Sequence, residues 1–217
     1  MSLQNYSKII RETRRGSNAQ RSEMINASTM RAVAVLKDRQ DLWPVLDVGC
    51  GEAYHVQENI KYGIPTVGLD IDIYGQLPEA QRRAKEQLGT YLPLVGGDAK
   101  YLPFKNDTFG RIDSRGMLMM IPFAVEEIEG DPIGQDRGAV QLAVVQVLSE
   151  MRRVAKPGGE VRIITFSDRE PLESRYFKPT PKELEDLGVV AGLTPLSVDY
   201  YREPNPRFSL IEARFQK

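Results

Sequence analysis

The sequence predicts an α/β fold: a doubly wound, mostly parallel sheet with helices on both faces and a C-terminal antiparallel hairpin. Three observations predict it. Strand-like and helix-like segments alternate from residue 44 to residue 166. The first strand-like segment runs into a turn with two glycines one residue apart. Two late β-like runs flank a segment that contains two prolines, which is typical of a hairpin.

The first elements follow from apolar spacing. Residues 18–38 carry apolar side chains at about helical intervals without a proline, which predicts a helix. Residues 44–49 form a short apolar run typical of a buried strand, and a helix is expected at about 53–61. A second buried strand is expected at 66–70.

The middle of the chain continues this alternation, with a helix at about 77–88 and a strand at 92–96. A fourth strand is expected at 109–114, although Gly110 inside it weakens the pattern. Residues 137–154 predict a long helix because their apolar positions are spaced four, three, four and three residues apart. Those positions are Val140, Val144, Val147, Met151 and Val154.

The last elements begin after Lys156-Pro157-Gly158-Gly159, a run that is expected to end the helix and turn the chain. A strand at 160–166 and a short helix at about 181–188, ending at Gly188, should follow. The runs 195–201 and 208–215 predict the hairpin.

Composition excludes several classes of protein. A chain of 217 residues suits one domain with a full core, and a net charge of −1 provides no general basic field for nucleic acid. No apolar run reaches the roughly 18 residues that span a bilayer, and the N-terminus lacks a signal-peptide pattern. The single cysteine, Cys50, excludes an internal disulfide, so a cytoplasmic protein is expected.

The chemical signals lie where strands end. Asp47 precedes the turn that contains Gly49 and Gly51, where the lack of side chains lets a ligand approach the backbone. Asp70 ends the second strand 23 positions later, and Asp98 follows the third strand. Tyr54 stands where a dinucleotide-binding turn has its third glycine, which argues against a nicotinamide-dependent oxidoreductase.

These motifs, with the later Lys156-Pro157-Gly158-Gly159 run, resemble the core of class I S-adenosylmethionine-dependent methyltransferases over residues 40–166. The family has a glycine where this chain has Ala53, and it often has an aspartate where this chain has Gly110. The resemblance implies seven strands, with the last inserted beside the fifth. It also implies S-adenosyl-L-methionine as the methyl donor and no metal.

The resemblance further implies a set of donor-binding residues. Asp47 would reach toward the donor's amino group, and Asp70 would accept hydrogen bonds from its ribose. Ile71 would lie against the adenine, while Asp98 and the Ala99 amide would contact the edge of that ring. The remaining candidates line the glycine turn or end the fourth strand: Gly49, Cys50, Gly51, Ser114 and Arg115.

Several of these assignments have alternatives. Asp72 competes with Asp70, Asp98 could simply form a turn, and Arg115 could pair with the donor's carboxylate or lie in solvent. The lone histidine, His55, is a weak candidate for a general base, and the catalytic residue is otherwise unknown. A base is needed only if the acceptor loses a proton as it attacks.

The acceptor is expected to be a small molecule. Residues 1–40 are interpreted as a helical lid segment over a donor-binding domain at 41–217. Residues 119–136 mix apolar and acidic side chains, which suits either a solvated loop or a pocket for a partly cationic acceptor. RNA or protein as acceptor, or donor binding without catalysis, are the alternative functions, and the oligomeric state is unknown.

Overall fold

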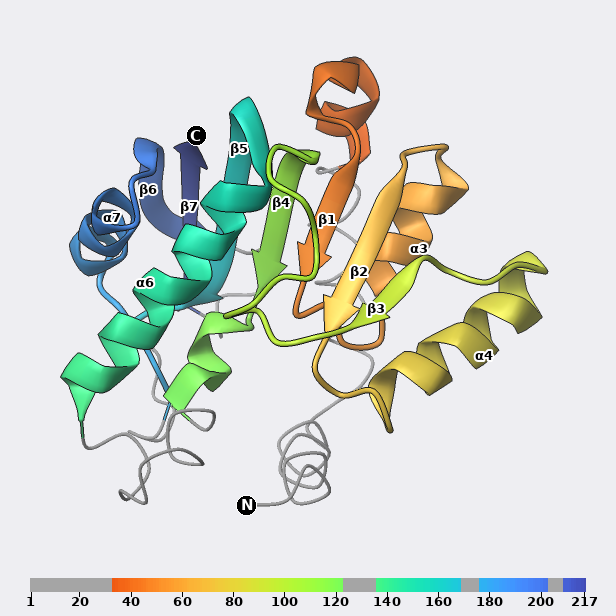
Figure 1. Cartoon of the computed structure of the whole chain (residues 1–217), viewed down its shortest axis with the longest axis horizontal. Helices are drawn as coiled ribbons and strands as arrows, with labels where there is room; N and C mark the ends of the chain where they lie inside the picture. Colours follow the sequence, from red (N-terminus) through yellow and green to blue (C-terminus); the bar gives the residue numbers. More distant parts are fainter. Residues whose placement is uncertain (1–32, 123–135, 169–175, 203–208) are drawn as a thin grey trace.

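The computed structural model describes residues 33–122, 136–168, 176–202 and 209–217. Its strands form one seven-stranded sheet in the order β3-β2-β1-β4-β5-β7-β6 (Figure 1). The strands from β3 to β5 are parallel, whereas β7 pairs antiparallel with both β5 and β6. The predicted fold class, with the last strand beside the fifth, is confirmed. The strands are β1 (Val45–Val48), β2 (Thr66–Asp70), β3 (Leu94–Gly96), β4 (Phe109–Arg115), β5 (Ala155–Phe166), β6 (Thr194–Arg202) and β7 (Ser209–Gln216).

Helices cover both faces of the sheet (Figure 1). The helices α6 (Arg137–Val154) and α7 (Pro181–Val190) lie on one face, and α3 (Tyr54–Lys61) lies on the other. The helix α4 (Gln76–Leu88) follows β2 and packs its alanines against the start of α3. Two short 3-10 helices are η1 (Gln40–Leu42) and η2 (Leu118–Met120). None of the helices in the described part of the chain is long and apolar enough to cross a membrane.

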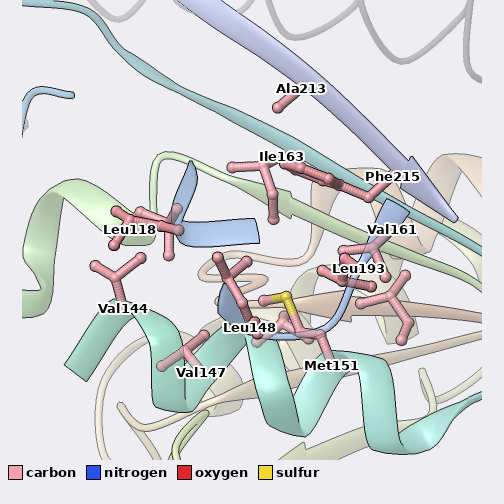
Figure 2. Packing of buried hydrophobic residues seen from close by; sticks show 14 of the residues in the cluster. Leu118, Val144, Val147, Leu148, Met151, Val161, Ile163, Leu193, Ala213 and Phe215 are labelled. Atoms are coloured by element: carbon pink, nitrogen blue, oxygen red, sulfur yellow. The ribbon is translucent and has the colours of Figure 1, made fainter. Parts of the chain in front are cut away.

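The main core lies between α6 and the sheet. The apolar side of α6 packs on alternate residues of the central strands, because successive side chains of a strand point to opposite faces. Figure 2 shows this packing for Leu118, Val144, Val147, Leu148, Met151, Val161, Ile163, Leu193, Ala213 and Phe215. A smaller cluster packs residues that precede β1 against β1 and against the residue two positions before β2. Its members are Val33, Leu36, Leu42, Val45 and Ile64. These clusters fix the strands whose ends carry the candidate site.

Most element boundaries agree with the predictions to within two residues, and two of the differences are informative. The strand β5 begins at Ala155 instead of 160, so Lys156-Pro157-Gly158-Gly159 forms an irregular stretch at its start. The helix α7 continues to Val190, past the expected end at Gly188. A Cβ at Gly188 would lie 2.3 Å from Cε1 of Phe215, so this glycine provides room for helix–sheet packing. The chain turns at Gly192 instead, where φ is +80°.

Gly110 does not weaken β4 but serves close packing. It is buried in the strand, and a Cβ there would lie 2.4 Å from the backbone carbonyl carbon of Leu42. Its amide donates to the Pro44 carbonyl at 3.0 Å. The aspartate that the family often has here would collide with the backbone of η1, which accounts for this departure.

Some predictions fall outside the described residues. The expected helix at 18–38 is described only over 33–38, which is helical. The lid segment at 1–40 and the acceptor-side loop at 119–136 are described only in part, so the prediction for each is still to be tested.

Candidate functional site

The glycine turn after β1 has the backbone conformation that its sequence predicts. Gly49 and Gly51 have φ values of +73° and +54°, in the region that glycine adopts without strain. A Cβ at Gly49 would lie 2.5 Å from Cβ of Met117, so the turn also packs closely on the segment after β4. Ala53, where the family has glycine, is fully buried with φ of +56° and therefore carries backbone strain.

Asp70 connects the glycine turn to β2. Its Oδ2 accepts a hydrogen bond from the Gly51 amide at 2.7 Å, and its Oδ1 accepts from the Asp72 amide at 2.9 Å. The carboxylate is buried at the carboxyl end of β2, and an ionised carboxylate has about four acceptor sites in all. A ribose with two adjacent hydroxyls is one ligand that such a carboxylate can bind.

Asp72, the competing candidate, has a different role. Its carboxylate accepts from the Gly75 amide at 2.9 Å and from the Gln76 amide at 3.3 Å, at the start of α4. It therefore caps the backbone amides that begin this helix. This arrangement supports Asp70 as the ligand-binding acid.

Asp98 and Ala99 follow β3, on the same edge of the sheet. The Oδ1 atom of Asp98 accepts from the Lys100 amide at 2.8 Å, which fixes a tight turn. The Asp98 side chain is 36% exposed, so it has a surface open to a ligand. Ile71, after β2, is likewise 37% exposed, and Ala99 is partly buried against the core.

Asp47 is the acid most affected by its surroundings. It is 3% exposed, and no described residue provides a hydrogen-bond partner for its Oδ2 atom. Burial raises the pKa of Asp47 to about 7, and although Arg115 opposes this shift, Asp113 and Asp70 reinforce it. A buried carboxylate oxygen that lacks a donor is well placed to receive a ligand's ammonium group.

Arg115 is largely covered and not solvated, since 12% of its side chain is exposed. Its Nη2 donates to Oδ2 of Asp113 at 3.2 Å, and its Nη1 lies 2.7 Å from Nε2 of His55. Neither the Arg115 Nε atom nor the Ser114 hydroxyl has a hydrogen-bond partner among the described residues. These two residues are successive in β4, so the Arg115 Nε atom and the Ser114 hydroxyl lie on opposite faces of the sheet.

His55 is poorly suited to act as a base. Burial and then the nearby Arg115 guanidinium hold the pKa of His55 well below its usual value. Protonation would place an imidazolium against a guanidinium, which is costly. Cys50 is equally unsuited as a nucleophile, because burial followed by the charge of Asp47 raises the pKa of its thiol.

Sequence reasoning missed a charged network on the sheet face that carries Asp47. Register places Asp47, Asp113, Arg162 and Arg214 side by side on β1, β4, β5 and β7. The close ion pairs on this face are Arg111–Asp113 at 2.8 Å, Arg115–Asp113 at 3.2 Å, Arg162–Glu212 at 2.7 Å and Arg214–Glu160 at 2.9 Å. Burial alone would raise the pKa of Asp113, but the arginines Arg111, Arg115 and Arg162 hold it well below its usual range.

A sequence signal for this network exists. Charged residues alternate with uncharged ones in three strands, as Arg111-x-Asp113-x-Arg115, Glu160-x-Arg162 and Glu212-x-Arg214. A period of two places them on one face. Because a face that carries charge normally looks toward solvent, the sequence alone gives no reason to expect burial.

Four strand ends therefore meet at one edge of the sheet, where ligands bind in open α/β folds. The edge offers backbone at the glycine turn, a carboxylate from β1 and another from β2, and a turn aspartate after β3. This set can hold a ligand that has an ammonium, a diol and a heterocycle. Within the described residues, no group of three or more His, Cys, Asp or Glu side chains could hold a metal ion.

Comparison with known proteins identifies the family. The family model described as a methyltransferase domain matches residues 46–163, more than half of the chain. The chain therefore belongs to the class I S-adenosylmethionine-dependent methyltransferases, as the sequence predicts.

A relative of similar sequence is a demethylmenaquinone methyltransferase of Streptomyces avermitilis, 32% identical over 175 residues. The match covers 80% of this chain and 64% of that relative. The match to the Streptomyces griseus protein of the same name covers 48% of that protein, so the chain spans about half to two thirds of these relatives.

Solved structures share the fold. A Burkholderia thailandensis 1,6-didemethyltoxoflavin-N1-methyltransferase, with 1,6-didemethyltoxoflavin and S-adenosylhomocysteine bound, superimposes with a TM-score of 0.64 at 18% identity. The superposition covers 100% of this chain and 91% of the Burkholderia chain. A Pyrococcus horikoshii protein superimposes with a TM-score of 0.67 at 19% identity, covering 93% and 92% of the two chains.

Proposed function

We propose that this chain transfers the methyl group of S-adenosylmethionine to a small-molecule acceptor. The observation that carries the proposal is the buried Oδ2 atom of Asp47, which has no partner among the described residues and lies at the family's glycine turn. The donor's α-ammonium would supply the missing hydrogen bond and the opposite charge. Asp70 would hold the ribose, and Asp98 with the Ala99 amide would hold the adenine.

The remaining candidates complete this assignment. The backbone at Gly49, Cys50 and Gly51 lets the methionyl part approach, and Ile71 lies against the adenine. The Arg115 guanidinium would face the donor's carboxylate, to which it is well suited, and the backbone at Ser114 and Arg115 would contact the donor. When bound, the donor supplies both the methyl group and its leaving group, so positioning of the acceptor in line is the main task of the protein.

We infer that an acceptor with an apolar body would lie near the described end of β4. Met119 and Ile121 follow this strand, and the Met119 carbonyl accepts from the Phe177 amide at 3.2 Å. Ile121 and Phe177 are buried, and Tyr176 beside them is 6% exposed. The relatives reported above are named for demethylmenaquinone, which also has an apolar body. A partly cationic acceptor is the alternative. The acidic residues that suggested it lie outside the described residues.

Release of S-adenosylhomocysteine during an acceptor screen tests the proposal. The panel should contain a demethylated quinone, an aromatic amine and a short RNA, each with S-adenosylmethionine in excess. Turnover with a small apolar acceptor is the expected result. Turnover only with RNA or protein would overturn the acceptor class. Donor binding without turnover in any assay would favour a non-catalytic binding protein.

A further inference from the structure

One side of α6 holds the loop that carries the proposed adenine contacts. We define the β3–β4 loop as residues 97–108, between the two strands of that name. Gln146, Glu150 and Arg153 are four and three residues apart on α6, so they share one side of the helix. Gln146 Nε2 donates to the Lys100 carbonyl at 3.4 Å, the first of several contacts with the loop.

Arg153 makes most of these contacts. Its Nη2 donates to the Leu102 carbonyl at 2.8 Å, and its Nη1 donates to the Phe104 carbonyl at 2.8 Å. The same Nη1 donates to Oδ1 of Asn106 at 2.9 Å. One planar guanidinium therefore binds every second residue from Leu102 to Asn106, which a lysine cannot do.

Glu150 completes the arrangement. Its Oε2 accepts from the Leu102 amide at 2.8 Å, so both backbone groups of Leu102 are bonded to this side of α6. Glu150 also forms a two-bond fork with Arg153, from Nε to Oε1 at 2.6 Å and from Nη2 to Oε2 at 2.7 Å. The hydrogen bond from Arg153 lowers the pKa of Glu150, so the carboxylate stays ionised.

The rest of the loop depends on this anchor. Leu102 is buried in the main core, and the ring of Phe104 packs edge-on against Phe109 with centroids 5.0 Å apart. Asp98 is the second residue of the same loop, and a hydrogen bond from the Tyr101 amide to the Asp98 carbonyl at 3.0 Å closes its turn. A shift of Leu102 would therefore move Asp98 and Ala99 as well.

We propose that Glu150 and Arg153 are positioning residues that determine how strongly the protein selects adenine in its donor. The proposal rests on the proposed function, because it requires that Asp98 and Ala99 contact the adenine ring. Neither Glu150 nor Arg153 touches the donor in this scheme. They hold the loop so that the Asp98 carboxylate meets the adenine amino group.

Two ligands separate this role from general stabilisation. S-adenosylhomocysteine has the adenine amino group, and S-inosylhomocysteine has an oxygen in its place. Calorimetry on the full chain should show tighter binding of the first ligand by the unaltered protein. Arg153→Lys should weaken S-adenosylhomocysteine binding about tenfold and leave S-inosylhomocysteine binding nearly unchanged. Glu150→Gln should show a smaller loss, because Gln can still accept from the Leu102 amide.

The matched control is Arg82→Lys. Arg82 pairs with Glu79 at the same three-residue spacing, but on the exposed surface of α4. This variant should bind both ligands as the unaltered protein does. Thermal unfolding of every variant shows whether the chain is folded at the assay temperature, and if Arg153→Lys is not folded there, Glu150→Gln decides the question.

Asp98→Asn distinguishes the two proposals. Asp98→Asn should remove the preference for S-adenosylhomocysteine. If it does so while folded Arg153→Lys and Glu150→Gln retain the full preference, the positioning role is overturned. The proposed function then still stands. If Asp98→Asn keeps the preference, or the unaltered protein binds neither ligand, the proposed donor site itself is wrong. An equal loss of both ligands in Arg153→Lys would also overturn the positioning role.

Discussion

At the scale of single residues, the raised pKa of Asp47 links ligand binding to pH. The pKa of Asp47, about 7, lies above its usual value of 3.8, so below pH 7 the folded chain without ligand favours the neutral acid. A donor's ammonium requires the ionised form. We therefore expect the affinity for S-adenosylhomocysteine to rise between pH 6 and pH 8, measured by calorimetry. Asp47→Asn should bind weakly and lose this slope, and an unchanged slope would contradict the assignment.

Ionisation of Asp47 favours ligand binding but lowers the stability of the ligand-free chain, so stability falls as the pH rises. Because the folded pKa is raised, the stability that Asp47 provides is present below about pH 4 and lost as pH rises through 7. Asp47→Asn should thus increase the free energy of unfolding of the ligand-free chain at pH 8, by on the order of 1–3 kcal/mol. Urea unfolding at pH 8 and pH 5.5 measures it, and the gain should be smaller at pH 5.5.

Asp70 and Asp72 give a matched pair two residues apart. Asp70→Ala removes the acceptor for the Gly51 amide and the proposed ribose contact, so donor binding should weaken by about 1.5–3 kcal/mol. Asp72→Ala removes a cap of α4 and should lower the free energy of unfolding by about 1 kcal/mol, with little change in donor affinity. Calorimetry and urea unfolding of both variants check this, and a reversed pattern would assign the ribose to Asp72.

At the scale of elements, the contact between α7 and β7 depends on Gly188. A Cβ there would lie 2.3 Å from the ring of Phe215, which is fully buried. Gly188→Ala should therefore destabilise the fold by about 1–3 kcal/mol, although alanine is the better helix former. Thermal unfolding measures the loss, with Val189→Ala on the exposed side of α7 as the control. An increase in melting temperature would mean that the helix can move away.

The segment before the first strand is a second element with a testable role. We propose that residues 1–40 act as a lid over the donor and acceptor, although residues 1–32 lie outside the described residues. Removal of residues 1–17 should leave a folded core with slower turnover. S-adenosylhomocysteine should slow proteolysis of this segment in the intact chain, and equal cleavage rates with and without ligand would contradict the lid.

Apolar periodicity predicted most elements because it reports directly on burial. It placed α6 at its observed bounds of 137 and 154. The end of α7 was wrong because it was predicted from a glycine stop signal, whereas Gly188 makes space for the ring of Phe215 in β7. The unusual start of β5 could not be predicted either, since it depends on pairing between Phe109 and Ala155.

At the scale of the whole molecule, the sequence predicted which strand ends share one edge of the sheet but did not predict the charged face behind it. Strand ends and the glycine turn are local signals, so the placement of Asp47, Asp70 and Asp98 at strand ends could be predicted. The burial of Arg111 and Glu160 depends on which strands become neighbours and on what covers them. Such burial is a property of the assembled sheet, and single-residue reasoning treats these side chains as solvated.

The position of β7 has a consequence for how the chain folds. It follows β6 in the chain but lies between β5 and β6 in the sheet, so β6 has no sheet neighbour until β7 is in place. Until then β5 is an open edge, a ready template for pairing with another molecule. The sheet is therefore complete only when β7 pairs with β5, and the slowest and most aggregation-prone stage should precede that pairing.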